Sequence, residues 1–353
     1  MPLLDVIELQ KHYTMSKASI DWQAVFRQFA SILPLRRAST EFDKPTSSQG
    51  DLKKPARVLY AVDGVSFQVH KNESVGLVGE SGCGKSTLVK ALSRLSDVDG
   101  GEIHLLDENI SATPAKRFVH SKLRKHIQVV FQDSHDSLNP RYSAFQCIAD
   151  PLINLLAIKD SAELTQRIYD LADKVNFPRE LLTRLPHQLS GGQKARVNIA
   201  RAIAVAPSLL ILDEPTSALD VSVQAIILKL LDSLKKELQL SYLFVSHDLN
   251  VVRMLCDRIL VMYMGKIVEL GDSHSLYRHS AHPYTQALIS AIPAINASHS
   301  RILLSGEVGS PINPEPNVCR FYLRCPKRSE LCRQKQPLLR KLSEQHYVAC
   351  HHV

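Results

Sequence analysis

One loop constrains the fold of this chain more than any other stretch. Residues 79–87 fit the pattern G-x-x-x-x-G-K-S/T, and the apolar residues 74–78 before them predict a short buried strand. Apolar side chains at helical spacing predict a helix over residues 85–95. Where a glycine-rich loop runs from a strand into a helix, backbone N–H groups converge on phosphate oxygens. The loop therefore predicts a phosphate-binding site. An accidental match is the alternative, which the flanking strand and helix disfavour.

The residue types in this loop suit a nucleoside triphosphate with Mg²⁺. Glycine has no Cβ, so the backbone can approach the phosphates closely. Lys85 supplies a mobile positive charge for the β- and γ-phosphates, and Ser86 offers its hydroxyl to Mg²⁺. The residues that we assign to the nucleotide from this loop are Gly79, Ser81, Gly82, Gly84, Lys85, Ser86 and Thr87.

Polar residues follow three further apolar runs that predict buried strands. Asp213 and Glu214 come directly after residues 209–212, where Asp213 can reach Mg²⁺ and Glu214 can activate the attacking water. Gln132 is assigned to Mg²⁺ or to that water, and His247 to the γ-phosphate. Taken singly, an Asp-Glu pair is more often a solvated turn and a histidine more often structural. The assignment therefore depends on the whole set.

A second phosphate-binding end is predicted at residues 189–193. Ser190 is a natural N-cap for the helix that follows, and the glycines leave its first N–H groups accessible. We assign Ser190, Gly192 and Gln193 to a nucleotide. One nucleotide rarely needs two such ends from one domain. Two copies of the chain, or this chain and a paralogue, are therefore expected to share it.

Composition bounds the class of protein. The 353 residues suffice for one large domain and a smaller one, and alternating strands and helices predict an α/β fold with a largely parallel sheet. The net charge of +8 is scattered along the chain, so no nucleic-acid partner is expected. The sequence shows neither an apolar run long enough for a membrane span nor a signal peptide, which predicts a cytosolic location.

These motifs together resemble those of the ATP-binding cassette (ABC) ATPases. The resemblance implies a P-loop nucleotide-binding domain over residues 1–275, with a parallel-sheet core, an antiparallel β subdomain and a helical subdomain at 133–190. It also implies a head-to-tail dimer that sandwiches two ATP molecules. The motifs lie in the family's order at 79–87, Gln132, 189–193, Asp213, Glu214, 217–220 and His247.

The resemblance implies roles for single residues as well. Glu214 is expected to be the catalytic base, with Gln132 and His247 beside it. Tyr13 is expected to stack on adenine, with Tyr60 as the rival because residues 14–57 form an insertion that disturbs the spacing.

Within that family the chain is similar to the ATPase subunits of oligopeptide/dipeptide importers. The similar segments are 131–133, 137–141, 214–225, 282–288 and 310–314, the last two in a C-terminal extension at 276–353. The similarity implies a peripheral protein on the cytoplasmic face of the bacterial inner membrane. It also implies two permease subunits, a second ATPase and a periplasmic solute-binding protein. The helical stretch after Gln132 would receive a permease helix.

Two other functions stay open at this point. The first is a soluble, non-transport ABC ATPase that acts on ribosomes or DNA, although such proteins usually carry two cassettes or a long coiled-coil insertion. The second is an inactive regulatory subunit, which the presence of Lys85, Asp213, Glu214 and His247 disfavours.

Four of the seven cysteines lie near the C-terminus with the spacing C-x5-C-x6-C-x17-C. In the resembled importers, four such cysteines are associated with a 4Fe–4S cluster, and we assign Cys319, Cys325, Cys332 and Cys350 to it. Zinc is the runner-up, with a nearby histidine as a substitute ligand, and reduced thiols are the third possibility. Basic residues such as Arg320 and Arg324 could offset the thiolate charge.

Two smaller expectations complete the sequence analysis. Apolar residues at helical spacing in 22–33 predict an amphipathic helix within the insertion, packed on the protein or lying on a membrane. Cys83 lies beside a helix N-terminus, which predicts a lowered pKa and sensitivity to oxidation. Cys83, Cys147 and Cys256 are nevertheless all expected to be small packing residues.

Overall fold

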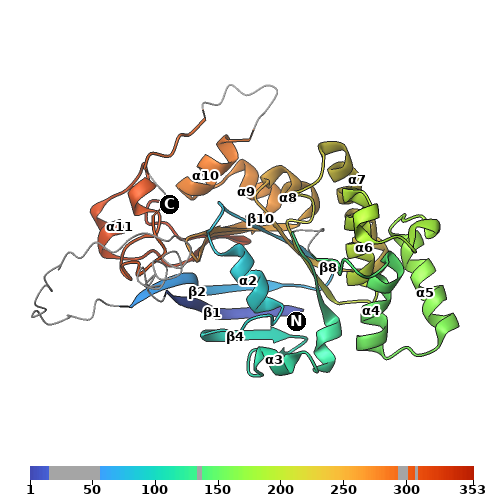
Figure 1. Ribbon diagram of the computed structural model, residues 1–353. Coiled ribbons are helices and arrows are strands. Elements are labelled where there is room, and N and C mark those ends of the chain that lie inside the picture. The colour runs from blue at the N-terminus through green and yellow to red at the C-terminus, as the bar shows by residue number, and fades with distance from the viewer. Residues whose placement is uncertain (16–55, 133–136, 293–300, 307–308) are drawn as a thin grey trace, which may run out of the picture.

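The computed structural model describes residues 1–15, 56–132, 137–292, 301–306 and 309–353. Within them the chain forms two sheets with helices around them, so the predicted α/β fold is confirmed (Figure 1). The smaller, antiparallel sheet has the order β2 (Arg57–Val69), β1 (Leu4–Met15), β4 (Gly100–Leu105), β5 (Glu108–Asn109). The larger sheet has the order β11 (Arg340–Ser343), β12 (His346–Val348), β10 (Lys266–Asp272), β9 (Arg258–Tyr263), β3 (Ser74–Val78), β8 (Ser241–Ser246), β7 (Leu209–Asp213), β6 (Ile127–Val130).

The larger sheet is parallel from β9 to β6. Strands β3, β7 and β8 are buried at every residue, as apolar strands with both faces covered should be. Because these strands are parallel, their carboxyl ends meet at one edge of the sheet. The loop 79–87, Gln132, Glu214 and His247 follow β3, β6, β7 and β8 in turn, so the topology gathers them at that edge.

The helices divide the molecule into recognisable parts. Helix α2 (Lys85–Leu92) contacts both sheets. Helices α4, α5 and α6 gather at one end of the molecule, and α10 and α11 at the other (Figure 1). The remaining bounds are α3 (Ala115–Phe118), α4 (Ala144–Leu156), α5 (Ser161–Lys174), α6 (Gly191–Ile203), α7 (Val221–Leu238), α8 (Leu249–Leu255), α9 (Ser273–Arg278), α10 (Pro283–Ser290) and α11 (Glu330–Gln334). Short 3-10 turns lie at Lys122–His126, Arg179–Leu181, Pro186–Gln188 and Tyr322–Arg324.

Two expected helix boundaries are wrong. The helix after the phosphate loop ends at Leu92 instead of residue 95, because Arg94 adopts a left-handed φ of 53°. The sequence also predicts a helical stretch over residues 143–187 with a break at Pro151, but the helix runs through this residue, since Pro151 lies inside α4. A capping box of Ser143 and Gln146 starts this helix and helps to offset the backbone hydrogen bond that proline cannot donate.

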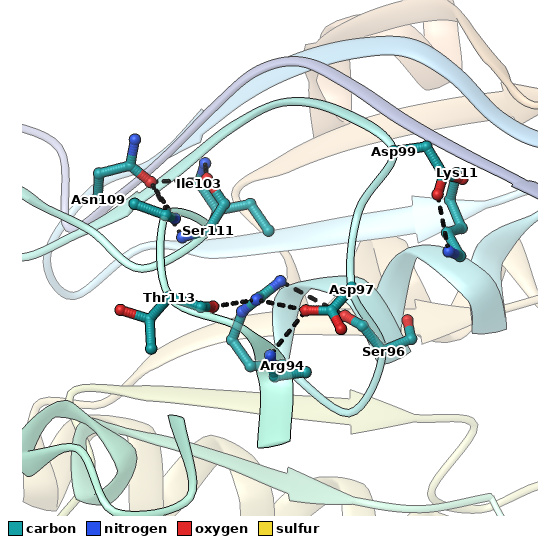
Figure 2. A network of polar contacts seen from close by, with 11 residues as sticks. Lys11, Arg94, Ser96, Asp97, Asp99, Ile103, Asn109, Ser111 and Thr113 are labelled. Carbon is teal, nitrogen blue, oxygen red and sulfur yellow. Dashed lines mark hydrogen bonds and ion pairs between the residues drawn. The ribbon is translucent and has the colours of Figure 1, made fainter. Parts of the chain in front are cut away.

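Arg94 explains why α2 ends where it does (Figure 2). Its guanidinium is buried and donates to the Thr113 carbonyl at 2.5 Å and to Asp97 Oδ1 at 3.1 Å. Asp97 in turn accepts the N–H of Ala115, at the start of α3. Asp99, two residues on, pairs with Lys11 of β1 at 3.1 Å. These contacts tie the end of α2 to the smaller sheet and so fix the helix that follows the phosphate loop.

The C-terminal extension returns to the body of the protein at both sheets. Strand β12 pairs with β10 at the edge of the larger sheet, and Asn313 exchanges two hydrogen bonds of 2.8 Å with the backbone of Val58 in β2. The helix expected in 22–33 lies outside the described residues. In the part of the chain that the structure describes, every helix is too short or too polar to cross a bilayer.

Candidate nucleotide site

The phosphate loop has a backbone that only glycine can adopt at two positions. Gly84 has a φ of 113°, and a Cβ there would lie 2.0 Å from the Ala61 carbonyl oxygen. Gly79 has a φ of 157°, and its Cβ would lie 2.2 Å from the Met262 carbonyl oxygen. Both neighbours are backbone atoms that cannot move aside, so the tight packing of β2 and β9 around the loop fixes its shape.

A cavity of about 590 Å³ opens beside this loop. Most of the predicted site residues line it, so the segments that follow four parallel strands, β3, β6, β7 and β8, surround one cavity. The lining residues are Leu59, Ala61, Ser81, Gly82, Gly84, Lys85, Ser86, Thr87, Gln132, Glu214 and His247. Lys85 is 6% exposed, and its ammonium donates to the carbonyls of Gly79 at 2.7 Å and Glu80 at 3.0 Å.

Two side chains converge on the carboxylate of Glu214. Gln132 Nε2 donates to Glu214 Oε2 at 3.1 Å, and His247 Nδ1 lies 3.3 Å from the same oxygen. Glu214 has a left-handed φ of 45°, the kind of backbone strain often found at functional sites. The structure therefore brings together the three residues assigned to catalysis.

The residues assigned to Mg²⁺ lie along a second, adjoining cavity of about 710 Å³. Ser86, Gln132 and Asp213 all line it. Burial, followed by the charge of Glu214, raises the pKa of Asp213 to about 6, against the opposing effect of nearby lysines. Hydroxyl, amide and carboxylate oxygens are the ligands that Mg²⁺ prefers, so the side chains of these three residues fit that ion.

Strand register separates the two tyrosines considered for adenine. Tyr13 pairs with Leu59, which lines the cavity, and paired residues of adjacent strands point to the same face of the sheet. Tyr60 is the next residue along β2 and so points to the opposite face, where its ring packs 4.2 Å from that of His12. Tyr13 is 38% exposed, which leaves its ring accessible to a base.

The second predicted phosphate-binding end forms as expected but stands apart from the first. Ser190 caps α6, and Gln193 completes a capping box with it. Ser190, Gly192 and Gln193 are not among the described residues that line the cavity beside the phosphate loop. A single chain therefore presents the two ends to different spaces.

The four C-terminal cysteines lie close enough for their charges to interact. Burial, together with the charges of Cys332, Cys325 and Cys350, raises the pKa of Cys319 to about 11. Cys332 Sγ also lies 3.5 Å from His352 Nε2. Nevertheless, the described residues contain no group of three or more His, Cys, Asp or Glu side chains placed to hold a metal ion. The geometry lends the predicted cluster, and its zinc alternative, no support.

The other cysteines are buried. Cys147 and Cys256 belong to the larger hydrophobic core, as expected of packing residues. Cys83 is 5% exposed and belongs to the smaller hydrophobic core, so its expected packing role is confirmed. The lowered pKa expected of its thiol is wrong, because burial raises that pKa despite the opposing charge of Lys85.

The sequence analysis missed two contacts between the C-terminal extension and the phosphate loop. The hydroxyl of Tyr284 accepts the N–H of Glu80 at 2.8 Å. The guanidinium of Arg324 forms two hydrogen bonds to the Glu80 carboxylate, at 2.7 and 3.1 Å. The two residues of each contact are 204 and 244 positions apart in the chain, so no local sequence pattern predicts these contacts.

A strand–loop–helix phosphate site, with acids and a histidine at neighbouring strand ends, defines the nucleotide-binding domain of an ATP-binding cassette. The ABC transporter family model matches residues 62–217, and the model for the C-terminal region of oligopeptide/dipeptide transporters matches residues 268–332. The chain belongs to the ATP-binding subunits of the oligopeptide/dipeptide family of ABC transporters, and it is an ATPase that uses ATP and Mg²⁺.

Individual relatives cover nearly all of the chain. It is 43% identical to the oligopeptide transport ATP-binding protein AppF of Bacillus subtilis (strain 168), over 91% of this chain and 97% of that protein. It is 39% identical to the dipeptide transport ATP-binding protein DppF of Escherichia coli (strain K12), over 99% and 94%. Among solved structures it is similar to the ATP-binding cassette MJ0796, a dimer bound to ADP and Pi. The TM-score is 0.60 and the identity 25%, over 76% of this chain and 98% of that one.

Proposed function

We propose that this chain powers the import of oligopeptides, dipeptides or related solutes by hydrolysing MgATP. The observation that carries the proposal is the convergence of Gln132 and His247 on Glu214 beside the phosphate loop. It occurs in a chain whose 43%-identical relative is an oligopeptide transport ATP-binding protein. The names of such relatives support peptide solutes.

The proposed roles follow from the geometry. Lys85 meets the β- and γ-phosphates once its ammonium leaves the two loop carbonyls that now hold it. The Glu214 carboxylate accepts a proton from the attacking water, while Gln132 and His247 keep its Oε2 in place. Ser86, Gln132 and Asp213 would hold Mg²⁺, which neutralises phosphate charge.

The remaining nucleotide contacts need a larger assembly. Tyr13 is proposed to stack on adenine, because its side chain and that of Leu59 lie on the same face of the smaller sheet. Ser190, Gly192 and Gln193 are proposed to close over the ATP held by a partner ATPase, either a second copy or a paralogue. The N-capped start of α6 supports this role, because its free N–H groups suit a phosphate.

We place the protein on the cytoplasmic face of the bacterial inner membrane, bound to two permease subunits that receive solute from a periplasmic binding protein. The 710 Å³ cavity supports a permease contact, because residues of α4 such as Asn154 and Leu155 line it together with Gln132. A permease helix seated there would touch the same glutamine that holds Glu214. That arrangement would couple transport to hydrolysis.

Separately, we propose that Cys319, Cys325, Cys332 and Cys350 hold a 4Fe–4S cluster, with zinc as the alternative. The support for this proposal is the spacing C-x5-C-x6-C-x17-C in the sequence. Iron and sulfide are measured in anaerobically purified protein, with Cys325→Ser as the comparison. Absence of both elements would end the cluster proposal, and zinc in their place would favour the alternative.

Isolation of the tagged chain from its native membrane in mild detergent tests the main proposal. We expect two permeases and a second cassette ATPase to accompany it, and peptides to stimulate ATP hydrolysis when the binding protein is added. Ribosomal proteins or DNA-repair factors without a permease would favour a soluble ABC ATPase and overturn the transport function.

A further inference from the structure

Arg324 joins the C-terminal extension directly to the phosphate loop. Its Nη1 bonds to Glu80 Oε2 at 2.7 Å and its Nη2 to Glu80 Oε1 at 3.1 Å. Such two-pronged arginine–carboxylate pairs are both strong and directional. The side chain of Arg324 is 10% exposed and that of Glu80 is 28% exposed, so water screens this pair less than a surface ion pair.

Glu80 connects the extension to the lysine of the site. Its N–H is held by the Tyr284 hydroxyl at 2.8 Å, and its carbonyl oxygen accepts from Lys85 Nζ at 3.0 Å. The same carbonyl accepts the N–H of Cys83 at 3.2 Å. A shift of Glu80 would therefore move both the turn of the loop and the ammonium that meets the phosphates.

Arg324 is itself held by rigid neighbours. It ends the 3-10 turn Tyr322–Arg324, and its guanidinium lies 6.0 Å from the ring centre of Tyr263. The Tyr263 ring packs 4.7 Å from Tyr284 and 5.2 Å from Phe321. One aromatic cluster thus packs against both Tyr284 and Arg324, the two side chains that hydrogen-bond to Glu80.

The negative charge of Glu80 would repel an anionic substrate, so its ion pair with Arg324 affects phosphate binding. Without Arg324, the loop would carry one carboxylate against one ammonium, that of Lys85. We propose that Arg324 is a positioning residue of the nucleotide site, which neutralises Glu80 and holds the phosphate loop in its ATP-binding form. The C-terminal extension then controls ATP affinity. The inference rests on the proposed function only in taking ATP as the ligand of the loop.

A double-mutant cycle on the full chain tests this inference. Equilibrium binding of MgATP is measured for wild type, Arg324→Gln, Glu80→Gln and the double variant. We expect Arg324→Gln to raise the Kd about tenfold in the wild-type background, because an unpaired carboxylate then opposes the phosphates. In the Glu80→Gln background the same change should raise the Kd less than about twofold, because that carboxylate is gone. Hydrolysis should show a higher KM for Arg324→Gln with kcat within about twofold.

Two further variants guard the interpretation. Arg328→Gln is the matched control, since Arg328 lies on the same extension and donates to the Leu323 carbonyl; its Kd should equal that of wild type. Arg324→Lys keeps the positive charge but cannot form the two parallel hydrogen bonds of a guanidinium. Its Kd should therefore lie between those of wild type and Arg324→Gln. If Arg324→Gln does not fold, the cycle is run with Arg324→Lys.

The outcomes separate the inference from the function. An unchanged Kd for the Arg324 variant, or an equal rise in both backgrounds, would overturn the positioning role. A wild-type chain that does not bind MgATP would instead overturn the proposed function.

Discussion

Gln132 Nε2 donates a hydrogen bond of 3.1 Å to Glu214 Oε2 and so joins the segment after β6 to the end of β7. His247 Nδ1 lies 3.3 Å from the same oxygen, although 64% of its side chain is exposed. The carboxylate that we assign as base is thus oriented by one residue near the helical end of the protein and another at the end of β8. Any movement of either segment would change the position of the base.

Glu214→Gln should bind MgATP within about threefold of the wild-type Kd but hydrolyse it at least 100-fold more slowly, because an amide cannot accept the proton of the attacking water. Single-turnover hydrolysis by the full chain, alongside equilibrium binding, measures both quantities. The control is Glu237→Gln, an exposed glutamate on α7 that pairs with Lys174. Wild-type turnover by Glu214→Gln would show that another group is the base.

Gly84→Ala should lower the free energy of unfolding by more than about 3 kcal/mol, because it adds a backbone clash to left-handed strain. Gly82→Ala is the matched comparison, since its φ is also positive but a Cβ there meets nothing within 4 Å. It should cost only about 1 kcal/mol. Denaturant unfolding checks both values, and equal losses would refute the clash argument.

Arg94→Met should destabilise the protein by about 2–3 kcal/mol, because the Thr113 carbonyl and Asp97 lose a buried donor. Arg117→Met, an exposed position on α3, should change stability by less than about 0.5 kcal/mol. Thermal unfolding compares the two variants. Similar midpoints would mean that the contacts in Figure 2 contribute little.

His282 should make the protein sensitive to acid. It is 2% exposed, its Nδ1 accepts the N–H of Tyr284, and burial lowers its pKa to about 3. Glu269 accepts the backbone N–H of His282, and His346 pairs with Glu269. Because the folded pKa lies below the unfolded value of 6.5, the unfolded chain takes up the proton first as the pH falls.

Stability is therefore lost below about pH 6.5, by about 2 kcal/mol between pH 7 and pH 5. His282→Asn keeps an acceptor for the helix start but does not titrate. It should be less stable than wild type at pH 7, and the difference should shrink by about 2 kcal/mol at pH 5. Unfolding in urea at both pH values gives the comparison, and a constant difference would exclude this role for His282.

The gathering of the candidate catalytic residues beside the phosphate loop could be predicted, because each of them carries a local signal. Gln132, Asp213, Glu214 and His247 end or follow apolar strands, and parallel strands bring such ends together whatever their order in the chain. Local apolar patterns in the sequence likewise predict the hairpin of β9 and β10 through Gly265 and the helix Val221–Leu238.

What the sequence did not predict depends on distant contacts. The early end of α2 follows from the buried guanidinium of Arg94, whose acceptor Thr113 lies 19 residues away. The raised pKa of Cys83 follows from packing that overrides the helix N-terminus. The Arg324–Glu80 pair spans 244 residues, so no local pattern in the sequence connects the two residues.

The pairing of β12 with β10 has a consequence for biosynthesis. Translation proceeds from the N-terminus to the C-terminus, so β10 leaves the ribosome well before His346–Val348. Until then the nascent protein has an open strand edge, and Glu269, fully buried in the finished structure, lacks its partner His346. An unfinished sheet edge of this kind is the surface that chaperones recognise and that aggregation exploits. The larger sheet therefore gains the strand that pairs with β10 only after His346–Val348 have emerged.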